Sequence, residues 1–132
     1  MDRLFLDANV LFSAAYRPNV GLLRLWRLPN VVLCTSHCAL EEARINLTED
    51  SQRHRLVRLS ASLNFFDAAS REQTRGINLP EKDIPIFLAA VEARSTHLIT
   101  GDLRHFGPYF GKKLLGILVL SPAEYFRLHS AL

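Results

Sequence analysis

The run Arg-Leu-Phe-Leu-Asp over residues 3–7 is a short apolar segment that ends on a carboxylate. The run His-Leu-Ile-Thr-Gly-Asp over residues 97–102 repeats this pattern far along the chain. Each run predicts a buried strand. A half-buried carboxylate at its end needs a partner or a ligand, because burying even a neutral polar group without a hydrogen bond costs about 2–7 kcal/mol. Ligands of open α/β sheets bind at the carboxyl ends of the strands. Asp7 and Asp102 therefore predict one acidic site assembled from both ends of the chain.

Strand-like and helix-like segments alternate around these two runs. Strands are expected at residues 3–6, 31–34, 64–66, 97–100 and 115–120. Helices are expected at residues 9–15, 22–29, 36–47, 50–63, 84–95 and 122–129, and an exposed loop at residues 70–80. This alternation predicts an α/β fold, with a short, mostly parallel sheet of about five strands flanked by helices.

Length and charge limit the class of protein. A chain of 132 residues fits one domain over residues 1–132, and its 48% of hydrophobic residues is enough for a core. The formal net charge of +3 and the pI near 9.2 are compatible with a polyanionic partner without requiring one.

Cysteine usage and hydropathy predict a cytoplasmic protein. Cys34 and Cys38 lack the further cysteines or histidines of a zinc site, so reduced structural thiols are favoured. Residues 1–3 lead directly into a strand, without the order of a signal peptide. Apolar runs also fall short of the roughly 20 residues that span a bilayer, so we expect no membrane segment.

Four carboxylates carry the candidate chemistry, and each also has an ordinary structural interpretation. Asp7 and Asp83 each precede a predicted helix, where an aspartate N-cap contributes about 1 kcal/mol. Glu41 and Glu42 both lie off the apolar stripe of their predicted helix, so a solvated face is the default for each, and helical geometry does not choose between them. Asp102 follows two small residues, which suit either close approach to a ligand or a turn.

The set of carboxylates indicates more than any single member. Acids gathered at one edge of a sheet repel one another and their pKa values rise, and a divalent cation relieves the repulsion. Hard carboxylate oxygens without a converging histidine or cysteine favour Mg²⁺ or Mn²⁺, which suit hydrolysis at phosphorus by a metal-activated water. The histidines show no ligand spacing. His105 follows Asp102 closely enough to contact a substrate, but a surface position is favoured.

Five short motifs follow one another along nearly the whole chain. They lie at residues 4–11 (Leu-Phe-Leu-Asp-Ala-Asn-Val-Leu), 36–44 (Ser-His-Cys-Ala-Leu-Glu-Glu-Ala-Arg), 82–86 (Lys-Asp-Ile-Pro-Ile, with alanines at 89 and 90), 98–102 (Leu-Ile-Thr-Gly-Asp) and 116–122 (Gly-Ile-Leu-Val-Leu-Ser-Pro). Each motif is degenerate, but the ordered set resembles the PIN-domain nucleases, including the VapC-type toxin ribonucleases.

The resemblance implies a PIN-like three-layer fold and Mg²⁺- or Mn²⁺-dependent cleavage of RNA. It also implies an antitoxin protein that occupies the site, and a homodimer. It selects Glu42 over Glu41, and gives Asn9 and Thr100 the task of holding a carboxylate or a water. Many relatives carry a further acid where this chain continues with Leu103, which leaves one metal or two open. The catalytic and metal-binding acids implied by position are Asp7, Glu42, Asp83 and Asp102.

A basic stretch is a candidate RNA-contacting surface. It comprises Arg53, Arg55 and Arg58, aided by Arg71 and Arg75, although a solvated helix face explains it as well. RNA contacts of this kind are salt-sensitive and mostly independent of sequence. Two other functions stay open: a catalytically silent PIN-like RNA-binding or interaction domain, and a metal-dependent nuclease or phosphatase that acts on another phosphoester.

Overall fold

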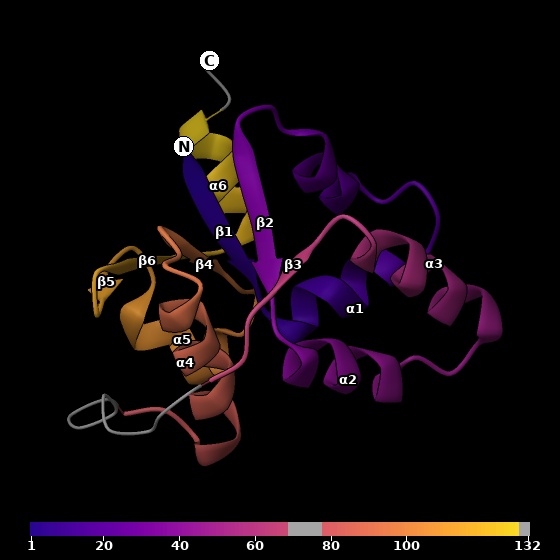
Figure 1. Ribbon diagram of the computed structural model, residues 1–132. Helices are drawn as coiled ribbons and strands as arrows, with labels where there is room; N and C mark the ends of the chain where they lie inside the picture. Colours follow the sequence, from indigo (N-terminus) through magenta and orange to yellow (C-terminus); the bar gives the residue numbers. More distant parts are fainter. Residues whose placement is uncertain (69–77, 130–132) are drawn as a thin grey trace.

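The computed structural model describes residues 1–68 and 78–129, so most of the loop predicted at 70–80 lies outside the described residues. A six-stranded sheet in the order β3-β2-β1-β4-β6-β5 forms its centre (Figure 1). The pairs β1–β2, β1–β4, β2–β3 and β4–β6 are parallel, and β5 is antiparallel to β6. The strands are β1 (Asp2–Leu6), β2 (Val31–Thr35), β3 (Asn64–Phe65), β4 (His97–Ile99), β5 (Lys113–Leu114) and β6 (Ile117–Leu120).

Helices flank the sheet, so the predicted α/β fold is confirmed (Figure 1). Helix α1 packs against both α2 and α3, whereas α6 packs against β6. The α-helices are α1 (Ala8–Tyr16), α2 (His37–Asn46), α3 (Asp50–Ser60), α4 (Ile84–Glu92), α5 (Leu103–Phe106) and α6 (Pro122–His129). Short 3₁₀ segments are η1 (Gly21–Arg27), which replaces the helix expected at 22–29, η3 (Glu81–Asp83) and η4 (Gly107–Tyr109).

The strand expected at 115–120 begins only at Ile117 and pairs in a hairpin with β5, so the sheet has one strand more than predicted. Strands β5 and β6 are joined by Leu115 and Gly116, whose φ angles are 49° and 80°. Two consecutive positive φ angles are typical of the tight turn that reverses the chain between antiparallel strands. This turn was not predicted from the sequence, because a leucine rarely adopts a left-handed backbone conformation.

Parallel register brings the ends of the two motif strands together. Leu6 of β1 pairs with Ile99 of β4, and Asp7 N donates to the Ile99 carbonyl at 3.1 Å. The residues that follow the two strands, Asp7 and Thr100, therefore start from the same edge of the sheet. Strand β2 ends beside them, since Phe5 pairs with Cys34, and α2 leaves from that end.

Helix α4 is buried over most of its length, and this burial positions the acid that precedes it. Residues 86–90, Ile-Phe-Leu-Ala-Ala, are all buried. A helix that is apolar around its circumference lies within the core rather than on it. Asp83 is therefore held almost out of solvent, at 4% exposure. Within the described residues, the structure contains no helix of the length and hydropathy that a membrane span requires.

Candidate functional site

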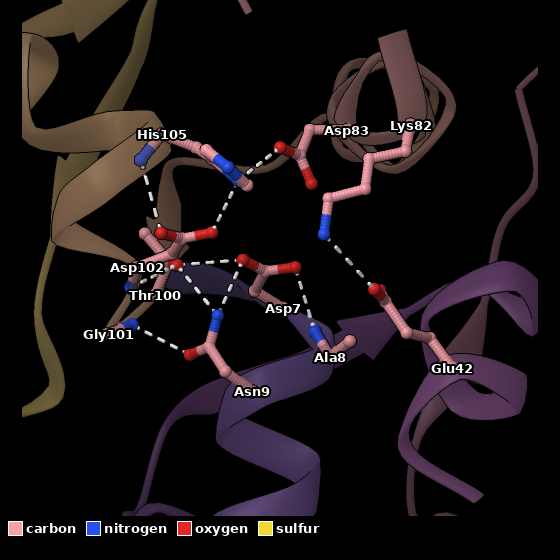
Figure 2. Close-up of polar contacts among 10 residues, drawn as sticks. All are labelled: Asp7, Ala8, Asn9, Glu42, Lys82, Asp83, Thr100, Gly101, Asp102 and His105. Carbon is pink, nitrogen blue, oxygen red and sulfur yellow. Dashed lines mark hydrogen bonds and ion pairs between the residues drawn. The ribbon is translucent and has the colours of Figure 1, made fainter. Parts of the chain in front are cut away.

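The four acids selected from the sequence line one cleft of about 400 Å³. They arrive from four separate parts of the fold, as Figure 2 shows. Asp7 follows β1, Glu42 lies on α2, Asp83 precedes α4, and Asp102 follows β4. The structure thus brings together side chains that are far apart along the chain, at the sheet edge where an α/β fold binds its ligands.

Asp7 is both a helix cap and a member of the cleft. Its side chain is buried, and Oδ1 accepts a hydrogen bond from the Ala8 backbone N–H at 2.8 Å, which caps α1. The second oxygen, Oδ2, accepts from Thr100 Oγ1 at 2.7 Å and from Asn9 Nδ2 at 2.9 Å. The two interpretations of Asp7 are therefore compatible, because each uses different lone pairs of the same carboxylate.

Asn9 and Thr100 tie the ends of β1 and β4 together. Asn9 Oδ1 accepts from the Gly101 N–H at 2.7 Å, and Thr100 Oγ1 accepts from the Asp102 N–H at 3.1 Å. A Cβ at Gly101 would lie 3.3 Å from Asn9 Oδ1, so a larger residue there would disturb this contact. The network orients Asp7 and fixes the backbone from which Asp102 projects.

Burial and mutual repulsion perturb two of the acids. Burial raises the pKa of Asp7 to about 6, and nearby Asp83 and Glu42 add to this, against the hydrogen bonds from Thr100 and Ala8. Burial also raises the pKa of Asp83, against the opposing charges of His105 and Lys82. A site that raises carboxylate pKa values in this way gains from any cation that enters it.

His105 lies inside the acidic cluster, so the expectation of a surface histidine is wrong. Its side chain is 19% exposed, and Nδ1 lies 2.7 Å from Asp83 Oδ2 and 2.8 Å from Asp102 Oδ2. The expectation that no histidine converges with the acids is wrong as well. Helix α5 is responsible, because Asp102 is its N-cap and His105 follows three residues later, where the His105 N–H donates to Asp102 Oδ1. The i, i+3 spacing was the available signal.

Asp83 does not cap α4 with its side chain, so the capping interpretation is wrong for this residue. Its Oδ2 is buried and, within the described part of the chain, makes the close contact with His105 Nδ1 but no well-directed hydrogen bond. An oxygen in this state keeps a lone pair for a cation.

The structure separates Glu41 from Glu42. Glu41 is exposed and pairs along the helix with Arg44, whose Nε donates to it at 2.9 Å. Glu42 is half-buried and lines the cleft, with Lys82 Nζ 3.7 Å from its Oε1. Lys82 also lines the cleft and was not predicted as a site residue, although its position directly before Asp83 was a signal.

The predicted basic stretch on α3 divides into different environments. Arg55 donates from Nε to the Ala15 carbonyl at 2.9 Å and from Nη2 to the Tyr16 carbonyl at 3.1 Å, so it closes the end of α1. Arg53 is half-buried and Arg58 is exposed. The predicted contributions of Arg71 and Arg75 lie outside the described residues.

The donors of the cleft fit a divalent cation. Carboxylate oxygens are the preferred ligands of Mg²⁺, Ca²⁺ and Mn²⁺. Asp83, Asp102 and His105 each offer one ligand atom, and these atoms lie within 4.8 Å of one another. The unsatisfied Asp83 Oδ2 and the raised pKa values are what such a site shows when only protein atoms surround it.

Two solved structures share the fold over nearly the full chain. A chain of VapBC2 from Rickettsia felis, crystallised bound to a DNA fragment from their promoter, has a TM-score of 0.67 at 13% identity, covering 90% of this chain and 98% of its own. A chain of VapBC-1 from nontypeable Haemophilus influenzae has a TM-score of 0.59 at 15% identity, covering 92% and 98%. No family model and no curated protein matches the sequence. The fold is VapC-like, as the resemblance to PIN domains predicted.

Proposed function

We propose that this chain is a metal-dependent endoribonuclease that hydrolyses RNA phosphodiester bonds, and the toxin component of a toxin–antitoxin pair. The observation that carries the proposal is the convergence of Asp7, Glu42, Asp83 and Asp102 on one cleft of a VapC-like fold. Like charges are not gathered in a half-buried cleft without a counter-charge, because their repulsion and desolvation oppose folding. Mg²⁺ or Mn²⁺ is the counter-charge that suits carboxylate oxygens.

The residues divide the work of such a centre. When bound, Mg²⁺ or Mn²⁺ supplies an activated water and neutralises charge on the phosphate. Asp7 Oδ2 already accepts two hydrogen bonds, from Thr100 and Asn9, whereas Oδ1 accepts one. Because each carboxylate oxygen has two lone pairs, Oδ1 is the Asp7 atom that is free for a cation. It points to the side of the cleft where Glu42 and Lys82 lie (Figure 2).

Lys82 offers a positive charge at the cleft, where a phosphate group of RNA would enter. Its side chain is exposed, and its 3.7 Å contact with Glu42 is long enough to exchange for a phosphate oxygen. Arg53 and Arg58 on α3 are retained as proposed RNA contacts, whereas Arg55 is already bound to α1.

The proposal includes a protein partner. Both structural neighbours come from VapBC assemblies, and we extend to this chain an antitoxin that covers the acidic cleft. A homodimer and a cytoplasmic location also belong to the proposal. Sedimentation of the purified chain tests for the homodimer. Inhibition of its cleavage activity by a co-expressed small partner protein tests the role of the antitoxin.

The test is cleavage of a panel of single-stranded RNAs with Mg²⁺, Mn²⁺ or EDTA. We expect metal-dependent cleavage by the wild-type chain and none by folded Asp102→Asn. Glu42→Gln should lose at least about tenfold in rate, the effect of disturbing a metal centre. Glu41→Gln, the matched control one residue earlier on α2, should stay within about twofold, since this carboxylate pairs with Arg44 outside the cleft.

Other outcomes identify the competing functions. Full activity of Asp102→Asn, or a greater loss in Glu41→Gln than in Glu42→Gln, contradicts the assigned site. Hydrolysis of DNA or of a small phosphoester with RNA left intact identifies a different substrate. Metal binding by the folded chain without hydrolysis of any of these substrates identifies a catalytically silent domain.

A further inference from the structure

We propose that His105 is itself a metal ligand, through Nδ1, so that it forms with Asp83 and Asp102 a mixed nitrogen and oxygen centre that favours Mn²⁺ over Mg²⁺. The inference rests on the proposed function only in placing the metal among the same acids. It adds a residue that the four-acid site does not include, and it states which of Mn²⁺ and Mg²⁺ the centre prefers.

The contacts of His105 leave one of its neighbours without a proton. Nδ1 lies 2.7 Å from Asp83 Oδ2 and 2.8 Å from Asp102 Oδ2, and a ring nitrogen carries at most one hydrogen. One N–H therefore faces two carboxylate oxygens at once. Neither His105 Nδ1 nor Asp83 Oδ2 makes a well-directed hydrogen bond within residues 1–68 and 78–129, although both atoms are buried. A cation between them satisfies all three atoms.

The burial of Asp83 is a second observation that supports a ligand at this point. Its side chain is only 6% exposed and it is aimed at His105 (Figure 2). A carboxylate oxygen so far from solvent, with no directed hydrogen bond from the described residues, is costly to keep ionised. The helix that it precedes does not use it as a cap.

The spacing of the three atoms suits a small divalent ion. Neighbouring ligands of octahedral Mg²⁺, with bonds of about 2.0–2.1 Å, lie about 2.9 Å apart, and those of the slightly larger Mn²⁺ lie slightly further apart. The observed distances of 2.7 and 2.8 Å need to widen by only a few tenths of an ångström. The backbone at His105 is fixed close to Asp102, because the His105 N–H donates to Asp102 Oδ1 at 3.1 Å and the adjacent Phe106 is fully buried.

A nitrogen ligand changes the choice of metal. Mg²⁺ strongly prefers oxygen and retains several waters, whereas the affinity of a nitrogen-containing site rises through the first-row metals from Mn²⁺. Loss of the imidazole should therefore reduce binding of Mn²⁺ more than binding of Mg²⁺. A histidine that only holds the two aspartates in place would reduce both by similar factors.

The test uses the full chain and a spectroscopic readout. Mn²⁺ is titrated into the wild type, His105→Ala and His105→Gln, and pulsed electron paramagnetic resonance measures coupling between Mn²⁺ and a directly bound nitrogen. The matched control is His54→Ala, on the exposed face of α3. We expect nitrogen coupling in the wild type and in His54→Ala, none in either His105 variant, and at least about a tenfold loss of Mn²⁺ affinity with a smaller loss for Mg²⁺.

The outcomes separate this inference from the proposed function. Bound Mn²⁺ without nitrogen coupling in the wild type overturns the role of His105 as a ligand, whether or not RNA is cleaved and whether or not the variants fold. Failure of the wild type to bind Mn²⁺ overturns it too, as do equal losses of Mn²⁺ and Mg²⁺ affinity in folded variants. Nitrogen coupling in a chain that does not cleave RNA supports the ligand and contradicts the ribonuclease.

Discussion

At the scale of single residues, Asp7 shows how one side chain serves both the fold and the site. Its oxygens cap α1 and anchor the Asn9–Thr100 network, yet it is 3% exposed among other acids. Its raised pKa of about 6 records the cost, because the buried carboxylate is harder to ionise in the folded chain than in the unfolded one.

This shift predicts how the stability of the metal-free protein depends on pH. The pKa of Asp7 is about 6 in the folded state against 3.8 in a model peptide. The folded state therefore binds the proton more tightly, and its contribution is fully present below about pH 4 and is lost as pH rises to about 6. The total loss is about 3 kcal/mol by linkage. Urea unfolding in EDTA at several pH values measures it.

Asp7→Asn is the variant that isolates this effect. An asparagine cannot ionise, so the fall in stability between about pH 4 and 6 should become smaller. The variant should also lose metal-dependent cleavage. Identical pH profiles for the variant and the wild type would show that Asp7 does not carry the shift.

At the scale of elements, α3 supports the site from a distance. Helix α1 carries Asn9 into the cleft, and Arg55 of α3 closes the far end of α1 through its two carbonyl contacts. Part of the basic stretch that was predicted to contact RNA therefore stabilises the packing of α3 against α1, through Arg55. A guanidinium is suited to this, because it donates several hydrogen bonds in a fixed plane.

The two roles of α3 predict different effects on stability for substitutions of Arg55 and Arg58. Arg55→Ala should lower the free energy of unfolding by about 1–3 kcal/mol, since two backbone carbonyls lose a charged donor. Arg58→Ala should change it by less than about 0.5 kcal/mol, because Arg58 is exposed.

If Arg58 contacts RNA, its variant should also bind RNA more weakly, with a shallower salt dependence. Denaturation and RNA titration at two salt concentrations separate these effects, and equal stability of the two variants would contradict the structural role of Arg55.

At the scale of the whole molecule, the acidic cleft is lined by segments that lie far apart along the chain. Asp7 and Asp102 come from opposite ends of the chain, and α2 and α4 deliver Glu42 and Asp83 from between them. Their repulsion acts on the packing of all these elements, so a cation that binds there should stabilise the fold as a unit.

Metal removal therefore has a predicted effect on global stability. At Mn²⁺ concentrations about 100 times the dissociation constant, binding adds about 2.7 kcal/mol to the free energy of unfolding. Thermal denaturation should show a higher Tm for the wild type with Mn²⁺ than with EDTA, and a much smaller difference for Asp83→Asn. An equal shift in both would place the bound metal outside the cleft.

The α/β architecture could be predicted from the sequence, and so could four acids that line one cleft. Alternating apolar runs specify strands and helices locally, and parallel strands necessarily bring their carboxyl ends together, so Asp7 and Asp102 could be paired without coordinates. The resemblance to PIN domains then favoured Glu42 over Glu41, a choice that the helix alone could not make.

Which polar groups meet at that edge of the sheet could not be predicted from the sequence and depends on how the elements pack. Asp83 precedes the buried helix α4 without capping it through its side chain. Helix α5 places His105 in contact with Asp83. The same holds for Arg55, whose partners lie on another helix. Side-chain contacts between distant segments depend on packing angles and burial, which apolar periodicity does not encode, whereas strand and helix placement depends mainly on local pattern.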